Sequence, residues 1–279
     1  MLEATDPATD SLDEAWIRET MRPEARKKLA RLTVLPETDS TNSHLLRLPT
    51  EDRHAHAVLA DRQTVGRGRR QRAWHSPAGG NIYLSLGWRV EATPWPLSTL
   101  ALVAAVAVCE ALSQAGLDGH GIKWPNDILV NGRKLAGILV ESQSSGSQST
   151  LVVLGVGLNV RMPDAGEERV DDVIDQPWTD LASEMNPEVG VPDRNQLSAM
   201  LLDALLSALD RFKENGFATF NEAWRQRDLL YGKRIMVEQN GVRIIGEARG
   251  IDKDGGLLLD TGASGVQVCH SGEVSVRYG

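Results

Sequence analysis

Two segments of the chain have the hydrophobic pattern of buried helices. Residues 100–109 are almost unbroken in apolar character, and we predict a core helix that opens at Pro96, continues to about Gln114 and ends before Gly116. In the second segment, apolar residues recur at helical spacing, at Leu197, Met200, Leu201, Leu205, Leu209 and Phe212. Asp193 precedes this segment and is expected to cap the helix.

Shorter apolar or alternating runs predict strands at residues 32–35, 57–60, 81–86 and 151–160. Gly155 and Gly157 interrupt the last run, and their missing side chains suggest the close approach of a ligand or of neighbouring backbone. Asn131-Gly132 lies between two apolar runs and is a strong hairpin signal, so Lys134 should lie on a strand just after a tight turn. Residues 142–150, rich in Ser and Gln, are expected to form a loop.

The two ends of the chain differ from the middle. Residues 1–11 are polar and are expected to form a frayed tail, followed by a short helix with Leu12, Ala15, Trp16 and Ile17 on one side. After Gly232, short apolar runs alternate with turns at Asn240-Gly241, at residues 254–256 and at Thr261-Gly262. This pattern predicts a small β-barrel at the C-terminus.

Composition places the chain among ordinary globular proteins. It has 279 residues, of which 41% are hydrophobic and 24% charged, enough for one large domain and a smaller one. The net charge of −8 makes a general nucleic-acid-coating role unfavourable. Cys109 and Cys269 are expected to be buried small hydrophobes in a reducing compartment, and the longest apolar run is too short for a membrane span of about 20 residues.

Residues 66–74, Gly-Arg-Gly-Arg-Arg-Gln-Arg-Ala-Trp, invert this acidic balance locally with four arginines and two glycines. Glycine widens the conformations open to the backbone, and the arginine guanidinium presents a fork of donors suited to phosphate or carboxylate. An anion-binding loop is the direct interpretation. A solvated basic turn or a nucleic-acid patch would have the same local composition.

Three further motifs change the weight of these alternatives. Asp39-Ser40-Thr41-Asn42 lies upstream of the arginine loop, and Lys-Trp-Pro-Asn-Asp at residues 123–127 and Arg-Lys-Leu-Ala-Gly-Ile at residues 133–138 lie downstream. In this order and spacing the motifs resemble the biotin protein ligases, from about Thr33 to the C-terminus. The resemblance implies a biotin–[biotin carboxyl-carrier protein] ligase, which adenylates biotin and passes it to a carrier lysine.

The resemblance implies an α/β (α+β) fold with three parts. Residues 1–32 form a tail and short helix, residues 33–230 a mixed-sheet, class II synthetase-like biotin/lipoate ligase catalytic domain, and residues 231–279 a small SH3-like β-barrel. Many members of the family carry an N-terminal DNA-binding domain. Since only about 33 residues precede the shared region here, a transcriptional repressor role is expected to be absent.

The resemblance also assigns site residues. Catalysis is expected from Lys134, Arg69 and Asp127, and the adenine side from Asn126 and Asn159. Biotin and the adenylate are expected at Ser40, Thr41, Asn42, Gln63, Gly66, Arg67, Gly68, Arg69, Arg70, Arg72, Trp74, Lys134 and Gly137. Asp127 has two open roles, as a ligand of Mg²⁺ or as the acceptor of the carrier lysine's proton. Trp124 is equally open between core packing and the site.

The implied reaction uses ATP, biotin and Mg²⁺, with the biotin carboxyl carrier protein of acetyl-CoA carboxylase as partner. Two anions must meet in its first step, so the fixed cations Arg67, Arg69 and Lys134 suit it. The expected setting is cytoplasmic, without nucleic acid or membrane; a homodimer and a monomer both remain open. The alternatives are a lipoate or octanoate ligase of related fold, a nucleic-acid-binding regulator, and a structural adaptor.

One position departs from the family pattern. Gln71 stands where the family commonly has a third glycine, and this puts the mobility of the arginine loop in question. The loop also lacks the dinucleotide fingerprint, and the chain has no P-loop motif. Our hypothesis is that residues 66–74 are disordered without ligand and close over the adenylate, keeping water from the anhydride.

Overall fold

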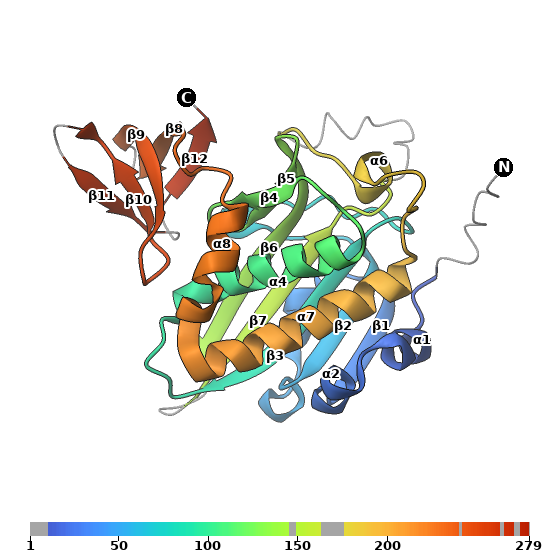
Figure 1. Cartoon of the computed structure of the whole chain (residues 1–279). Coiled ribbons are helices and arrows are strands. Elements are labelled where there is room, and N and C mark those ends of the chain that lie inside the picture. Colours follow the sequence, from blue (N-terminus) through green and yellow to red (C-terminus); the bar gives the residue numbers. More distant parts are fainter. Residues whose placement is uncertain are drawn as a thin grey trace.

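The computed structural model describes residues 11–144, 149–162, 176–239, 242–262, 265–270 and 274–278. Within these residues the strands form a seven-stranded mixed sheet and a five-stranded antiparallel sheet (Figure 1). The mixed α/β class and the small C-terminal β domain expected from the sequence are both confirmed.

The large sheet has the order β1-β2-β3-β7-β6-β5-β4. Its strands are β1 (Arg31–Thr38), β2 (His56–Gln63), β3 (Ile82–Glu91), β4 (His120–Lys123), β5 (Asp127–Val130), β6 (Arg133–Ser144) and β7 (Ser149–Leu158). Strands β1 and β2 are parallel, because α3 (Thr41–Arg47) crosses between them, and the other pairs are antiparallel.

The C-terminal sheet has the order β11-β10-β9-β8-β12. Its strands are β8 (Arg234–Gln239), β9 (Val242–Ile251), β10 (Leu257–Asp260), β11 (Val266–Cys269) and β12 (Val274–Tyr278). The remaining helices are α1 (Glu14–Thr20), α2 (Pro23–Lys28), α4 (Leu100–Gln114), α6 (Leu181–Glu184), α7 (Arg194–Asn215) and α8 (Asn221–Arg227). Short 3₁₀ turns are η2 (Thr50–Asp52), η3 (Arg69–Gln71), η4 (Leu97–Thr99) and η5 (Gly216–Phe220).

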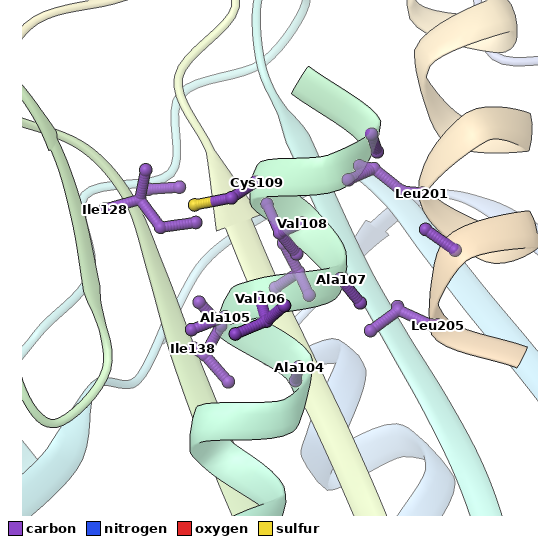
Figure 2. Packing of buried hydrophobic residues seen from close by; sticks show 14 of the residues in the cluster. Ala104, Ala105, Val106, Ala107, Val108, Cys109, Ile128, Ile138, Leu201 and Leu205 are labelled. Atoms are coloured by element: carbon purple, nitrogen blue, oxygen red, sulfur yellow. The ribbon is translucent and has the colours of Figure 1, made fainter. Parts of the chain in front are cut away.

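Helices α4 and α7 cover one face of the large sheet (Figure 1). Helix α4 is apolar all round because it lies between the sheet and α7, with Ile128 and Ile138 on one side and Leu201 and Leu205 on the other (Figure 2). A helix buried on every side needs no polar face. As predicted, α7 begins after Asp193, whose side chain accepts hydrogen bonds from the first helical backbone amides.

The apolar segment that contains α4 also has the composition of a membrane-spanning helix. The helical segment Leu97–Gln114 is long and apolar enough to cross a membrane by composition, so our length-based exclusion was too strict. Most of this segment is buried inside the fold, which is typical of a core helix.

Helix α3 covers the opposite face of the sheet. Leu45 packs there with Val58, Leu151 and Val153, whereas the neighbours of these strand residues in sequence point to the main core. This alternation is the period-two pattern of a strand. The sheet is therefore covered on both faces where α3 packs on β2, β3 and β7, and a cleft opens on the second face toward β6 and β5.

The N-terminal helices pack on α7. Ile17 in α1 is fully buried, and the Arg22 side chain between α1 and α2 pairs with Asp203 of α7. The expectation that Trp16 also packs inward was wrong, because 42% of its surface is exposed. The helix begins at Glu14, so Trp16 falls one position, about 100°, away from the buried side.

The hairpin prediction is confirmed, and one loop prediction was too wide. Asn131 and Gly132 connect β5 to β6 with φ of 50° and 77°, the left-handed values that a two-residue turn requires. Strands β6 and β7 extend into residues 142–150, where Ser144 pairs with Thr150, because ladder bonds continue through polar positions. Residues 145–148, the Asn240-Gly241 turn and residues 1–10 lie outside the described residues.

Candidate active site

A cleft of about 1930 Å³ opens on the second face of the large sheet. Pockets for one small ligand usually measure about 300–1,000 Å³, so this cleft has room for two ligands side by side. Every site residue expected from the sequence lines it. Residues from β2, β5, β6, β7, α3 and the arginine loop thus meet in one place.

Strands β6 and β7 form the floor of the cleft, and the alternation of side chains along each strand determines which residues face it. On β7, Val156 and Leu158 point into the core, so Gly155 and Gly157 face the cleft. On β6, Gly137 and Glu141 face the cleft by the same alternation. The floor is flat where the glycines lie.

Side chains, rather than ligand or backbone, occupy the space above these glycines. A Cβ on Gly155 would lie 2.5 Å from Asn42 Oδ1, and a Cβ on Gly157 would lie 2.6 Å from the Trp74 indole. The expected close approach to these glycines is confirmed, but the approaching groups are side chains and not a ligand or backbone. The glycines let Asn42 and Trp74 lie flat on the sheet.

The segment Ser40–Asn42 begins α3 and is almost entirely buried. Ser40 is the N-cap residue, yet its side chain makes no capping hydrogen bond. Instead, Gln63 Oε1 accepts hydrogen bonds from the Thr41 backbone amide at 2.9 Å and from its hydroxyl at 3.2 Å. The Ser40 hydroxyl therefore makes no hydrogen bond to the first backbone amides of α3.

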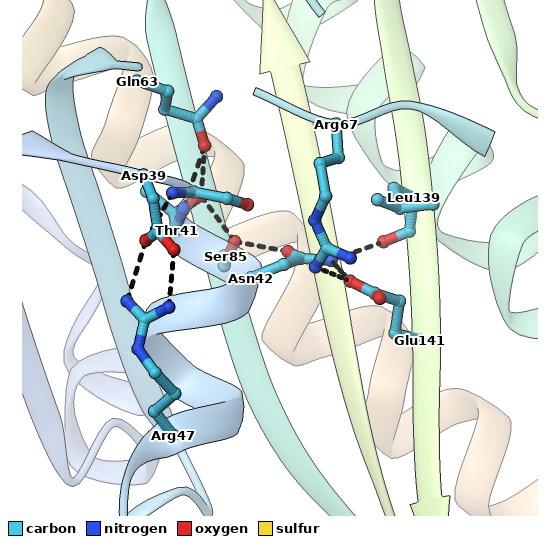
Figure 3. A network of polar contacts seen from close by, with 10 residues as sticks. Asp39, Thr41, Asn42, Arg47, Gln63, Arg67, Ser85, Leu139 and Glu141 are labelled. Carbon is cyan, nitrogen blue, oxygen red and sulfur yellow. Dashed lines mark hydrogen bonds and ion pairs between the residues drawn. The ribbon is translucent and has the colours of Figure 1, made fainter. Parts of the chain in front are cut away.

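Asp39 anchors this segment from outside the cleft. Its carboxylate accepts two hydrogen bonds from Arg47, at 2.5 and 2.8 Å, and one from the Ser40 amide at 2.8 Å (Figure 3). The Arg47 guanidinium holds the pKa of the Asp39 carboxyl well below its usual range. Asp39 thus carries a structural charge that fixes the start of α3.

The arginine loop closes on itself at its base. The Trp74 amide donates to Gly66 O at 2.9 Å, and the Gly68 amide donates to Arg72 O at 2.7 Å. At the tip, Arg70 and Gln71 have φ of 57° and 60°. Gln71 therefore adopts a left-handed conformation that glycine would adopt without steric cost.

The arginines of the loop divide into two pairs. Arg67 and Arg69 are partly buried, whereas Arg70 and Arg72 are exposed at the cleft wall. Arg67 pairs with Glu141 at 2.9 Å, and Arg69 donates to Asn126 Oδ1 at 3.2 Å. Burial lowers the pKa of Arg69, which nevertheless remains a cation at neutral pH.

Lys134 faces the loop from β6. Its Nζ lies 2.8 Å from Asp127 Oδ1 and 5.1 Å from the centre of the Trp74 ring. Both members of the Lys134–Asp127 pair are largely buried. Lys123 lines the cleft beside them, and burial lowers its pKa. Together with Arg67 and Arg69, these lysines concentrate positive charge in a cleft of an acidic protein.

The two asparagines support the walls. Asn126 Nδ2 donates to Ile138 O at 2.7 Å, which leaves its Oδ1 to Arg69. Asn159 is buried, and its Nδ2 donates to Thr179 O at 3.0 Å. Trp124 is almost fully buried and its indole donates to Gly255 O at 3.0 Å, which is a packing role. The residue also borders the cleft, so a role in the site stays a prediction.

Sequence reasoning missed several cleft residues. Glu141 and Ser76 line the cleft and are bonded to predicted residues, and Trp178 lines the wall after a segment outside the described range. Ser85 is buried behind the cleft, where it is bonded to Thr41 and Asn42. Glu141 had a usable signal, since it is a lone charge at the end of an apolar strand run and lies on the same face as Gly137. Ser85 had none, because its role depends on its neighbours across the sheet.

Two buried donors of the loop are unsatisfied. Among the described residues, neither Arg67 Nε nor Trp74 Nε1 has a hydrogen-bond partner. A buried donor without a partner costs about 1–3 kcal/mol. A ligand that supplies acceptor oxygens in the cleft would recover this cost.

Comparison with known proteins agrees with this arrangement. The sequence model of the biotin/lipoate A/B protein ligase family matches residues 34–159, and that of the biotin protein ligase C terminal domain matches residues 231–277. The bifunctional ligase/repressor BirA of Escherichia coli is 38% identical over 248 residues, covering 88% of this chain and 74% of that protein.

Two further relatives match nearly their whole length. The biotin–[acetyl-CoA-carboxylase] ligase of Mycobacterium tuberculosis is 36% identical over 255 residues, covering 88% of this chain and 89% of that protein. The structure of the Aquifex aeolicus biotin protein ligase in complex with biotin and ATP has a TM-score of 0.74 and 28% identity, covering 90% and 100% of the two chains. The chain therefore belongs to the biotin protein ligases of the biotin/lipoate A/B protein ligase family, and it is a ligase.

Proposed function

We propose that this protein activates biotin with ATP and transfers it to the acceptor lysine of a biotin carboxyl carrier protein. In the first step a biotin carboxylate oxygen attacks the α-phosphorus, the bond to the β-phosphate breaks, and pyrophosphate leaves. In the second, the lysine amine attacks the acyl carbon, the acyl–oxygen bond breaks, and AMP leaves. The observation that carries the proposal is the convergence of Lys134, Arg67 and Arg69 on one cleft that the Thr41 and Gln63 network also lines.

The proposed roles follow from charge. Two like charges about 4 Å apart repel by about 4 kcal/mol at an effective dielectric constant of 20, so fixed cations can remove several kcal/mol of the barrier. Lys134 would contact the reacting carboxylate and α-phosphate oxygens, with Arg67 and Arg69 along the acyl phosphate. Thr41, Asn42 and Gln63 would bind the ureido head of biotin, which needs donors and acceptors, and Asn126 and Asn159 would border the adenine.

Asp127 keeps two proposed roles, and the structure bears on each. Its carboxylate is bonded to Lys134, and no group of three or more metal-binding side chains occurs among the described residues. Mg²⁺ commonly binds through one or two carboxylates and substrate phosphates, so the cleft fits an ion that arrives with ATP and uses Asp127 alone. In the other role, Asp127 would take the proton released by the carrier lysine.

ATP–pyrophosphate exchange tests the adenylation step. Biotin, lipoate and octanoate would be offered separately to the purified protein, with Lys134→Ala measured beside it. We expect exchange with biotin alone, reduced in the variant by at least about 100-fold, because one preorganised donor to a developing charge is worth about 10²–10³ in rate. Exchange with lipoate or octanoate would move the protein to the sister branch of the family, and no exchange with any acid would overturn the proposal.

We further propose that the protein acts as a ligase only, in the cytoplasm, with no nucleic-acid partner. The net charge of −8 and the likeness to relatives named only as ligases support this. Binding to DNA in a shift assay with biotin and ATP present, weakening with added salt, would contradict it. Light scattering with and without both substrates decides between the monomer and the homodimer that the family likeness suggests.

A further inference from the structure

One hydrogen-bond network ties both ends of the arginine loop to the Ser40–Asn42 segment, and Figure 3 shows the part that includes Arg67. At the first end, Arg67 Nη2 contacts Glu141 Oε2 at 2.9 Å, and the same oxygen accepts a hydrogen bond from Asn42 Nδ2 at 2.8 Å. Glu141 is thus a single carboxylate shared between the loop and the segment. None of the roles proposed above involves it.

The network continues from Asn42 through the sheet. Ser85 Oγ lies 2.5 Å from Asn42 Oδ1 and 2.7 Å from Thr41 Oγ1, and its one proton serves one of them. Ser85, Thr41 and Asn42 are nearly excluded from solvent. With its Nδ2 on Glu141 and its Oδ1 beside Ser85, the Asn42 amide has a fixed orientation.

The network then returns to the other end of the loop. Thr41 is bonded to Gln63 Oε1, Gln63 Nε2 donates to Ser76 Oγ at 3.0 Å, and Ser76 Oγ donates to Trp74 O at 2.9 Å. In a polar network whose middle is buried, each bond polarises the next, so a change at one bond alters its neighbours.

We propose that Glu141 is a positioning residue that couples the head-binding segment to the order of the arginine loop. This inference rests on the proposed function only in taking biotin as the ligand of that segment. Arg67 and Glu141 form the charged pair of the network, so the carboxylate holds Arg67 over the cleft when the loop is closed. A ligand head that engages Thr41 and Asn42 acts on the same chain of bonds and so on the loop.

The experiment uses Glu141→Gln, which keeps the shape of the side chain and removes its charge. Hydrogen exchange of residues 66–74 in the protein saturated with biotin should become roughly tenfold faster, the loss expected for a charge-assisted hydrogen bond. The KM for biotin in ATP–pyrophosphate exchange should rise by a similar factor, with the KM for ATP changed less than about twofold.

Glu110→Gln is the matched control. Glu110 pairs with Arg211 at 3.3 Å, and the two side chains are 29% and 37% exposed, close to the 26% and 35% of Glu141 and Arg67. The pair joins α4 to α7 outside the cleft, so its loss should leave loop exchange and the KM for biotin unchanged.

A second variant protects the test against a fold defect at Glu141. Arg67→Gln removes the partner from the loop side and should accelerate loop exchange to a similar extent. The double variant should be no faster than the faster single variant, because both changes break one interaction. Loop exchange at the wild-type rate in Glu141→Gln, or single effects that multiply, would overturn the inference.

The two proposals fail in different ways. If the wild-type protein shows no ATP–pyrophosphate exchange with biotin, the ligase proposal is refuted. An active wild-type protein whose Glu141→Gln variant has a wild-type loop and a wild-type KM for biotin refutes this inference alone.

Discussion

At the residue scale, the cleft combines positive charges that are already partly compensated. Lys134 has Asp127 at 2.8 Å, and Arg67 has Glu141 at 2.9 Å. Each cation therefore has a carboxylate partner that positions it in the cleft, and the approach of a substrate anion exchanges one partner for another. The exchange costs less reorganisation than the ordering of a free side chain would.

His56 makes the free energy of unfolding depend on pH on the acid side of neutrality. His56 is buried, with Nδ1 bonded to Asp52 O and Nε2 to Thr33 Oγ1, an arrangement that suits the neutral ring. Burial lowers the pKa of His56 from its ordinary value of 6.5, and nearby Arg31 lowers it further against the opposing effect of Asp52. Because the folded pKa lies below the unfolded one, the stabilisation is complete above pH 6.5 and is lost as pH falls through the folded pKa.

We therefore expect the free energy of unfolding to fall between about pH 7.5 and about pH 5.5, by up to about 1.4 kcal/mol per pH unit for each such histidine. Denaturant unfolding at both pH values measures it. His56→Gln should show a flatter dependence than the wild type. Equal slopes in the two proteins would show that His56 does not contribute.

At the element scale, the arginine loop is shaped by its base more than by its tip. Gly66 lies under the bond that closes the loop, whereas Gln71 takes a left-handed conformation at the tip. That conformation costs a non-glycine residue about 1 kcal/mol. Because Gln71 stands in place of the family's glycine, the ordered tip has a higher free energy than it would have with glycine, although no contact is lost. The expectation that the loop is open without ligand stays a prediction.

Gly66→Ala and Gly68→Ala separate the two parts of the loop. A Cβ on Gly66 would lie 2.4 Å from Trp74 O and 2.5 Å from Ser76 Oγ, whereas a Cβ on Gly68 would come no closer than 3.5 Å, to Arg72 O. Overpacking of this kind costs about 1–3 kcal/mol, so we expect Gly66→Ala to weaken biotin binding by roughly tenfold or more and Gly68→Ala by less than about threefold. Titration calorimetry with biotin measures both, and equal effects would show that the loop base is not rigid.

At the scale of the whole molecule, the two sheets are joined through the core helix. Trp124 follows β4 at the edge of the large sheet and donates to Gly255 in the turn between β9 and β10. A Cβ on Gly255 would lie 2.8 Å from Leu102 of α4, so this turn packs closely on the helix. Trp124 therefore forms a contact between the two domains, directly after Lys123 of the cleft.

Trp124→Phe tests this junction. The ring stays buried, but Gly255 O loses its donor, and we expect a loss of about 1–3 kcal/mol, which lowers Tm by several degrees. Thermal unfolding followed by circular dichroism measures the change. Trp16→Phe is the control, because Trp16 is 42% exposed, and an equal drop in both variants would contradict the assignment.

Much of the fold could be predicted because local patterns and tertiary contacts agree. The apolar run of α4, the Asp193 cap of α7 and the Asn131-Gly132 turn each contain their own signal within a few residues. The prediction was weaker where the signal is shared with neighbours. Residues 142–150 are polar like a loop, yet strand pairing extends into them.

Most of the elements, the family and many of the residues that line the cleft could be predicted from the sequence, since periodicity, turn chemistry and motif spacing are local properties of the chain. The tertiary structure was needed to show that Glu141 joins Arg67 to Asn42, that Ser85 contacts Thr41, and that Gly157 makes room for Trp74. These contacts join residues far apart in the chain. Their energies depend on distances of a few ångströms, which the packing of the sheet sets and the order of residues does not encode locally.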